Sequence, residues 1–290
     1  MSNKTEQGFG TLKQQLSLLP ETLSHTILNH IRQHIHYEPV VGIMGKTGAG
    51  KSSLCNALFA GEVSPVSDVT ACTREPLRFR LNVGERCMTL VDLPGVGESE
   101  RRDAEYAAMY RQQLPHLDLV LWLIKADDRA LAVDEHFYYQ VIGEAWRHKV
   151  LFVVSQADKI EPTEGGVKAL SAIQKQSLER KIALLHTLFL PVHPVCAVSV
   201  RLRWGLSHMA ALMVASLPRE ASSPLVTQLQ PPLRSERVTQ KARDDFADTV
   251  GSTLDSVSRL PLIPATVRTL IQTLRDTVVS VARALWSVFF

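Results

Sequence analysis

Apolar runs alternate with helix-like stretches through the middle of this 290-residue chain. Short uninterrupted apolar runs are typical of buried strands, whereas apolar residues spaced three and four apart predict helices. We expect strands at residues 39–44, 76–81, 86–92, 117–124, 149–155 and 192–199. We expect helices at residues 52–59, 102–113, 130–144, 167–188 and 206–217. This order predicts an α/β fold with a mostly parallel six-stranded sheet and helices on both faces.

Helical segments flank this α/β domain on both sides. Leucine and isoleucine recur at near-helical spacing within residues 12–36, and residues 265–290 are amphipathic. Serine and proline at 222–224 and 231–232 predict a linker before the second helical segment. The expected organisation is an N-terminal helical extension at residues 1–37, a main domain at 38–217, a linker at 218–239 and C-terminal amphipathic helices at 240–290.

The last amphipathic segment leaves three interpretations open. Its charged residues exclude a plain transmembrane span. It can pack on its own domain or on the N-terminal helix, or it can bind a partner or a second copy. It can also lie on a membrane surface, since Arg283, Trp286, Phe289 and Phe290 suit an interface.

The residues after the first strand match the phosphate-binding loop (P-loop) pattern of glycine, four residues, glycine, lysine and serine. Glycines let the backbone approach a phosphate chain, and the order strand, loop, helix places that chain at a helix N-terminus. Lys51 supplies a charge for the terminal phosphates, and the Ser52 hydroxyl is a ligand for Mg²⁺. The residues expected to bind the nucleotide here are Gly45, Lys46, Thr47, Gly48, Ala49, Gly50, Lys51, Ser52 and Ser53.

An Asp-x-x-Gly motif ends the strand at residues 86–92. Asp92 can hold Mg²⁺ through water, and Gly95 can donate its N–H to a γ-phosphate and move when that phosphate leaves. Between the two motifs, residues 61–70 are rich in Gly, Pro, Ser and Asp, which predicts an exposed loop. A threonine here, Thr70 or Thr73, would reach Mg²⁺ and the γ-phosphate only in the triphosphate state.

Two later strands carry residues suited to reading a base. The strand at residues 149–155 runs into a polar tetrad that ends in Asp158. This carboxylate can accept hydrogen bonds from the N1 and N2 donors of guanine, a pair that adenine lacks. The last strand ends at Ser199 and Val200, where a backbone N–H can meet the guanine O6.

In this order the elements resemble a GTPase G domain of the TrmE-Era-EngA-EngB-septin group, and within it the YeeP/YfjP-type Era-like bacterial GTPases. The passages that carry the resemblance are residues 42–58, 71–75 (Ala-Cys-Thr-Arg-Glu) and 91–97 (Val-Asp-Leu-Pro-Gly-Val-Gly). The likeness covers residues 38–217. It implies binding of GTP and GDP with Mg²⁺ held by Ser52, Thr73 and Asp92, and it favours Thr73 over Thr70 through the Thr-Arg-acidic triplet.

The chain departs from this family at informative positions. Ser155 and Gln156 replace the usual Asn or Thr and Lys of the base-reading tetrad. A glutamine covers less of a base than a lysine stem, so we expect guanine preference with a weakened clamp. Val96 has no group to orient an attacking water, which predicts slow intrinsic hydrolysis. Arg74 and Arg78 are basic groups near the loop that is expected to become ordered in the triphosphate state.

Composition agrees with a globular cytoplasmic protein. The chain is 45% apolar, and a formal net charge of only +3 gives no strong case for nucleic acid. Its four cysteines lack a metal or redox spacing, and the polar N-terminus shows no signal peptide.

Two functions follow from these features. The first is a slow Mg²⁺-dependent GTPase that acts as a switch, with Lys51, Thr73 and Gly95 at the reaction. The alternative is a nucleotide-gated binding module with negligible hydrolysis that acts through its C-terminal helices. Either one can self-associate or bind a protein through those helices.

Overall fold

The computed structural model describes residues 3–65, 76–96, 100–163 and 169–290. The chain forms two compact units. The sheet unit comprises residues 39–217 and 228–235, and the helical unit comprises residues 1–38, 218–227 and 236–290.

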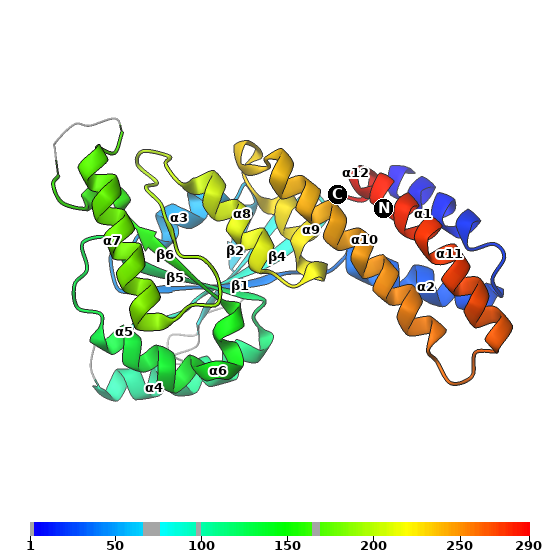
Figure 1. The fold of residues 1–290 in the computed structure, drawn as a ribbon, viewed down its shortest axis with the longest axis horizontal. Helices are drawn as coiled ribbons and strands as arrows, with labels where there is room; N and C mark the ends of the chain where they lie inside the picture. The colour runs from blue at the N-terminus through cyan, green and yellow to red at the C-terminus, as the bar shows by residue number, and fades with distance from the viewer. Residues whose placement is uncertain (1–2, 66–75, 97–99, 164–168) are drawn as a thin grey trace. The chain divides into compact units, whose positions relative to one another are not determined.

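A mixed sheet forms the centre of the sheet unit (Figure 1), in the strand order β2-β3-β4-β1-β5-β6-β7. The parallel strands are β4 (Arg86–Asp92), β1 (Val40–Gly45), β5 (Leu119–Lys125), β6 (Val150–Ser155) and β7 (Cys196–Ala197). At one edge β2 (Glu62–Pro65) and β3 (Leu77–Val83) pair antiparallel. The predicted mostly parallel α/β sheet is therefore confirmed.

The described residues form seven strands, one more than the six expected. The additional strand is β2, which lies in the segment expected to be an exposed loop. Its backbone pairs with β3 from Glu62 opposite Asn82 to Pro65 opposite Phe79. Pairing with an existing edge overrides the low strand propensity of Ser and Pro, and Pro65 is tolerated because β2 is itself an edge strand.

Helices cover both faces of this sheet, with α3 and α8 on one side and α4 to α6 on the other (Figure 1). Their bounds are Lys51–Leu58 for α3, Glu100–Gln113 for α4, Ala132–Phe137 for α5, Gly143–Trp146 for α6, Ala172–Phe189 for α7 and Leu206–Ser216 for α8. Trp122 on β5 anchors the core, with its ring centroid 5.3 Å from that of Phe152 and 6.2 Å from that of Phe189. The side chains of β5 and β6 are almost entirely buried, as expected for parallel strands covered on both faces.

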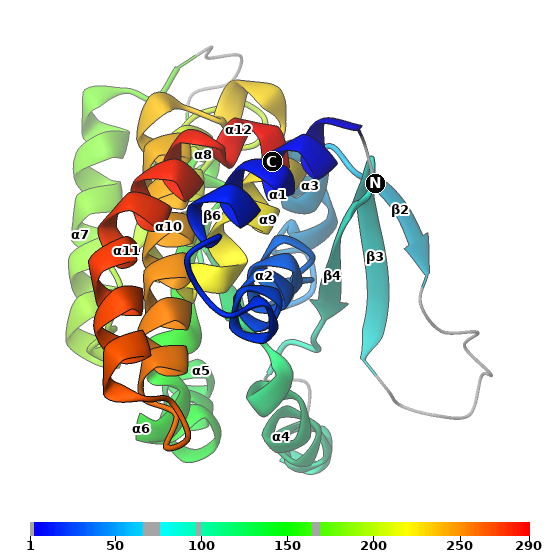
Figure 2. The same ribbon diagram turned by 90° about the vertical axis from the view of Figure 1, so that its right-hand side faces the viewer.

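The helical unit contains α1 (Asn3–Gln15), α2 (Glu21–Ile35), α10 (Glu236–Ser258), α11 (Ala265–Ala284) and α12 (Trp286–Phe289), together with α9 (Arg219–Gln228) up to its last residue. Helices α10 and α11 run side by side (Figures 1 and 2). No helix in the described part of the chain is both long enough and apolar enough to cross a membrane.

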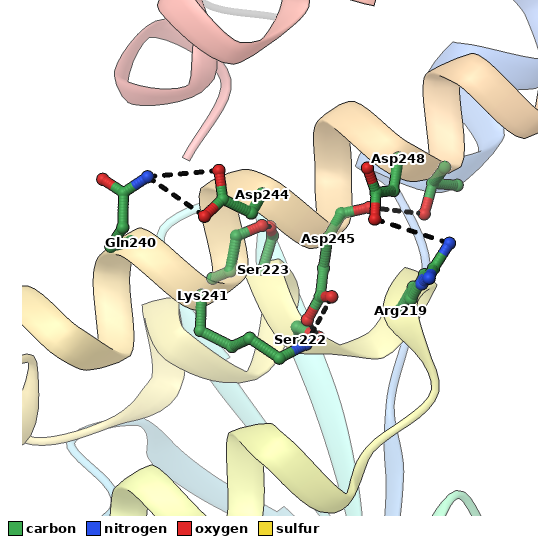
Figure 3. Close-up of polar contacts among 10 residues, drawn as sticks. Arg219, Ser222, Ser223, Gln240, Lys241, Asp244, Asp245 and Asp248 are labelled. Carbon is green, nitrogen blue, oxygen red and sulfur yellow. Dashed lines mark hydrogen bonds and ion pairs between the residues drawn. The ribbon is translucent and has the colours of Figure 1, made fainter.

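The segment expected to be a linker, residues 218–239, instead contains α9, the 3-10 turn Pro231–Leu233 and the start of α10. Ser222 and Ser223 are buried, not solvated. Ser222 donates to Asp245 at 2.6 Å (Figure 3), and Ser223 donates to the carbonyl of Ala242 at 2.9 Å. These bonds fix α9 on α10, so tertiary contacts override the local turn preference of Ser and Pro. After α9, Gln230 donates its N–H to the carbonyl of Leu58 at 2.7 Å and joins the sheet unit.

The C-terminal amphipathic segment packs within its own unit. Ile271, Val278 and Ala282 of α11 are buried, as are Trp286 and Phe289. The ring of Phe289 lies 5.3 Å from that of Phe9 on α1, and Trp286 donates its indole N–H to Ser223 Oγ at 2.8 Å. Of the three interpretations, packing on the N-terminal helix is the one observed. Of the aromatic residues assigned to a membrane interface, Trp286 and Phe289 are buried and Phe290 is partly buried.

Replacing Trp286 with alanine should therefore destabilise the helical unit by about 3–5 kcal/mol, because it leaves a cavity and removes a buried hydrogen bond. The measurement is urea unfolding followed by circular dichroism. Leu262→Ala is the matched control, since Leu262 is 92% exposed and its truncation should change stability by less than about 0.5 kcal/mol. Equal midpoints for the two variants would contradict this packing.

Candidate nucleotide-binding site

The loop between β1 and α3 is built from glycines in conformations that other residues avoid. Gly48 and Gly50 have φ values of 77° and 88°, in the left-handed region. The loop closes where Ala49 donates its N–H to the carbonyl of Lys46 at 2.9 Å. Helix α3 begins directly afterwards at Lys51, so its first N–H groups face the loop. Such a turn concentrates backbone donors as a phosphate group requires.

Gly95 lies in close contact with the start of this loop. A Cβ atom on Gly95 would stand 2.5 Å from the carbonyl oxygen of Gly45 and 2.8 Å from the Cα of Lys46. Gly45 itself has φ 153°, and a Cβ there would meet the carbonyl oxygen of Leu123 at 2.7 Å. Glycine at 95 lets the segment after β4 run against the P-loop, and glycine at 45 lets the start of the P-loop run against β5.

Lys51 and Asp92 lie side by side at the end of the sheet. Lys51 Nζ donates to the carbonyl of Gly45 at 3.1 Å and lies 3.8 Å from Asp92 Oδ1. Burial raises the pKa of Asp92, although Lys51 opposes this. Among the described residues, Asp92 Oδ1 is buried and accepts no hydrogen bond. A buried carboxylate oxygen without a donor fits a hard cation such as Mg²⁺.

Asp158, expected to read the base, lies on the 3-10 turn Ala157–Lys159. Its Oδ1 accepts from Ser199 Oγ at 2.5 Å and its Oδ2 accepts from Arg201 Nε at 2.9 Å. Burial alone would raise the pKa of Asp158, but the hydrogen bonds from Ser199 and Arg201 outweigh it and lower the pKa. The carboxylate is therefore held ionised as an acceptor.

Gln156 connects the base side to the phosphate side. It adopts the left-handed conformation at φ 53°, and its side chain donates from Nε2 to the carbonyl of Gly48 at 2.5 Å. A cavity of about 330 Å³ opens beside this contact. It is lined by Ala49, Gly50, Ser53, Leu54, Ser155, Gln156, Asp158, Lys159, Val198, Val200 and Arg201. This volume lies within the usual range for small-molecule sites.

The structure thus brings the P-loop, Asp92, Gly95, Gln156, Asp158, Ser199 and Val200 to one end of the sheet. The N–H of Ser199 donates to the carbonyl of Trp204 at 3.0 Å, so of the two backbone donors expected to meet guanine O6 only that of Val200 is left. Thr70 and Thr73, the two switch candidates, lie outside the described residues.

Two contacts at this site had no signal in the sequence. Arg201 bonds Asp158, although the two are separated by more than forty residues. The side chain of Lys46, counted among the phosphate-binding residues, instead pairs with carboxylates that follow β5.

Fold and site together define a P-loop nucleotide-binding domain of the G-domain class. A family model described as "50S ribosome-binding GTPase" matches residues 40–156. The chain is 67% identical over 284 residues to uncharacterized protein YkfA of Escherichia coli K12, covering 98% of this chain and 99% of the relative. It is 70% identical over 279 residues to uncharacterized protein YfjP of the same strain, covering 96% and 97%. The chain therefore belongs to the Era-like bacterial GTPases of the YeeP type, as the motifs predicted.

More distant likenesses cover a smaller share of the chain. GTPase Era of Aquifex aeolicus is 29% identical over 143 residues, which is 48% of this chain and 47% of the relative. The crystal structure of Era with MgGDPNP and a segment of 16S ribosomal RNA is 24% identical, with a TM-score of 0.46, covering 63% of this chain and 58% of that one.

Gln156→Ala should weaken GDP binding by up to about ten-fold, because it removes one hydrogen bond between the base side and the P-loop. Gln156→Lys should bind at least as tightly as the wild type, since a lysine also reaches the Gly48 carbonyl and covers more of the base. Calorimetric titration measures both, with the exposed Gln140→Ala as the matched control. Unchanged GDP affinity in Gln156→Ala would show that the hydrogen bond from Gln156 to the Gly48 carbonyl does not support nucleotide binding.

Proposed function

We propose that this protein binds GTP and GDP with Mg²⁺, hydrolyses GTP slowly and acts as a nucleotide-dependent switch. The observation that carries the proposal is the cavity in which P-loop residues such as Gly50 and Ser53 meet the carboxylate of Asp158. A phosphate cradle and a base-reading acceptor on one wall are the two requirements of a nucleotide site.

The phosphates lie in this proposal across the N-terminus of α3, where Lys51 compensates their charge. Ser52 and Asp92 would hold Mg²⁺, whose charge would stabilise negative charge on the phosphates. Thr73 completes the metal site in the triphosphate state. The donor-free Oδ1 of Asp92 supports its share in this assignment.

Guanine is read by Asp158, whose ionised carboxylate accepts from N1 and N2. Ser199 keeps the carboxylate oriented through its bond to Oδ1. The N–H of Val200 meets the guanine O6. Adenine offers no matching donor pair, so it would leave a polar group at Asp158 without a partner, which disfavours ATP.

Slow hydrolysis rests on the residues beside Gly95. Val96 is buried and apolar, so it orients no water. Arg78 donates to Gln113 on α4, which engages its guanidinium away from the reaction, and Arg74 lies outside the described residues. Turnover then depends on an activator or on Thr73 and the metal alone.

The buried Val96 also favours the second candidate, a nucleotide-gated binding module with negligible hydrolysis. In that case the helical unit is the effector. Because buried residues of α11 already pack inside the unit, the proposed contact with a protein partner or a second copy uses the turn between α10 and α11, where Leu260 and Leu262 are exposed. Neither candidate requires nucleic acid, and both suit a cytoplasmic location.

Two variants test nucleotide recognition by calorimetry. Lys51→Ala should abolish GTP and GDP binding in a folded protein, because the phosphate charge loses its partner. Asp158→Asn should weaken guanine nucleotides by about 5- to 150-fold, equivalent to 1–3 kcal/mol, and favour xanthine nucleotides. Asp276→Asn, an exposed carboxylate in the helical unit, is the control. Equal affinity of the wild type for ATP and GTP would refute the assignment of Asp158.

Turnover and switching separate the two candidates. Residues 61–73 should resist proteolysis with a GTP analogue and be cleaved with GDP, and Thr73→Ala should abolish the difference while keeping GDP binding. Slow Mg²⁺-dependent phosphate release that is lost in Thr73→Ala supports a GTPase. Protection without any release favours the binding module, and equal cleavage in both nucleotide states rules out the switch.

A further inference from the structure

The side chain of Lys46, the second residue of the P-loop, is caged by three acceptors. Its Nζ lies 2.7 Å from Asp134 Oδ2, 2.9 Å from Asp128 Oδ2 and 2.6 Å from the carbonyl oxygen of Ala130. The contacts with Asp128 and Ala130 are hydrogen bonds, and the contact with Asp134 is a close ion pair. Lys46 therefore points away from the phosphate cradle and its charge is already compensated.

The acceptors belong to a rigid part of the sheet unit. Asp134 is on α5 with a side chain only 4% exposed, and Asp128 lies in the connection between β5 and α5. The second oxygen of Asp128 accepts the N–H of Ala130 at 3.0 Å, which fixes this connection. Lys181 of α7 donates to the backbone carbonyl of Asp128. Two lysines and two aspartates thus balance in charge.

The electrostatics favour the charged form of this lysine. Burial alone would lower the pKa of Lys46, but hydrogen bonds to Asp134 and Asp128 outweigh it and raise the pKa. Burial raises the pKa of Asp134, whereas Lys46 opposes that rise. Removing the lysine would leave a buried carboxylate without its counterion, which is costly.

The backbone of Lys46 is the point at which several P-loop contacts meet. Its carbonyl accepts the N–H of Ala49, and its Cα faces Gly95. The preceding carbonyl, that of Gly45, accepts from Lys51. Any displacement of Lys46 would therefore shift both the closing turn of the loop and the acceptor that orients Lys51.

We propose that Lys46 is a positioning residue, which anchors the P-loop to Asp128 and Asp134 and so holds its backbone in the conformation that binds phosphates. The inference rests on the proposed nucleotide function and goes beyond it, because it assigns the side chain of Lys46 to the loop's scaffold and not to the ligand.

Lys46→Met tests the anchor, since methionine keeps the length of the side chain and removes its charge. GDP affinity by calorimetry should fall on the order of ten-fold, the lower end of what supporting residues around a bound group contribute. Lys46→Arg should restore affinity, because a guanidinium can bridge two carboxylates. GDP affinity unchanged in Lys46→Met would overturn the proposal.

The sheet unit offers a matched control in Lys149. Its Nζ also donates to backbone carbonyls, those of Leu114 at 3.0 Å and Leu117 at 2.5 Å. Lys149 comes directly before β6, whereas the P-loop follows β1, so the two lie at opposite ends of the parallel strands. Lys149→Met should lower the thermal midpoint and leave GDP affinity intact. Equal losses of affinity in both methionine variants would show a general effect of stability and overturn the positioning role.

A double variant separates position from stability. Lys46→Met with Asp134→Asn removes one charge of each sign, so the thermal midpoint should recover toward the wild type. The tether is still absent, so GDP affinity should stay weak. Recovery of both quantities together would mean that Lys46 acts only through stability, which overturns the proposal.

Hydrogen exchange of residues 45–51 without added nucleotide gives a readout that does not depend on binding. Exchange should be faster in Lys46→Met than in Lys149→Met or the wild type, because the loop opens more often once it is untethered. Equal exchange in all three proteins would overturn the anchor. If the wild type bound no guanine nucleotide, the proposed function would fail while this measurement still decided the tether.

Discussion

The close approach of the backbone at Gly45 and Gly95 is the constraint on which the site depends. Gly95 lies where a side chain would collide with the Gly45 carbonyl, and Gly45 lies where one would collide with β5. The ends of β4, β1 and β5 are thereby brought within backbone contact of one another. This contact places Asp92 beside Lys51 and turns an apolar sheet edge into a polar site.

Charged and polar residues of the central strands lie at the strand ends that form this site. Strands β5 and β6 are apolar until their last residues, Lys125 and Ser155, so the buried part of the sheet requires no compensation. Three carboxylates at or after the ends of the strands are paired with a cation: Asp92 with Lys51, Asp128 with Lys46, and Asp158 with Arg201. The site is proposed to receive phosphates, which repel carboxylates. Pairing each of these three carboxylates with a cation reduces that repulsion.

The sequence predicted the parts of the fold and site that are encoded locally. The P-loop, the Asp-x-x-Gly turn and the tetrad at Asp158 are contiguous motifs that follow buried strands, and the structure gathers them at one sheet edge. The contacts of Lys46 were beyond prediction because its partner Asp128 is 82 residues away. Helix α9 was missed because the run Ser222-Ser223-Pro224 resembles a linker until α10 supplies acceptors for the two serines. Amphipathicity likewise defines an apolar face of α11 but does not identify what covers it.

On the proposed function, guanine donates to a carboxylate whose Oδ2 already accepts from Arg201. Where a guanine donor displaces Arg201, the net gain is the difference between the two hydrogen bonds that are exchanged, not the full value of one. Arg201 has a 57% exposed side chain, so its pair with Asp158 is largely screened by water and costs little to exchange. Ser199 is buried and keeps its bond to the other oxygen, so the carboxylate stays oriented during the exchange. The arrangement therefore holds an ionised acceptor in place with one firm partner and one that a base can displace.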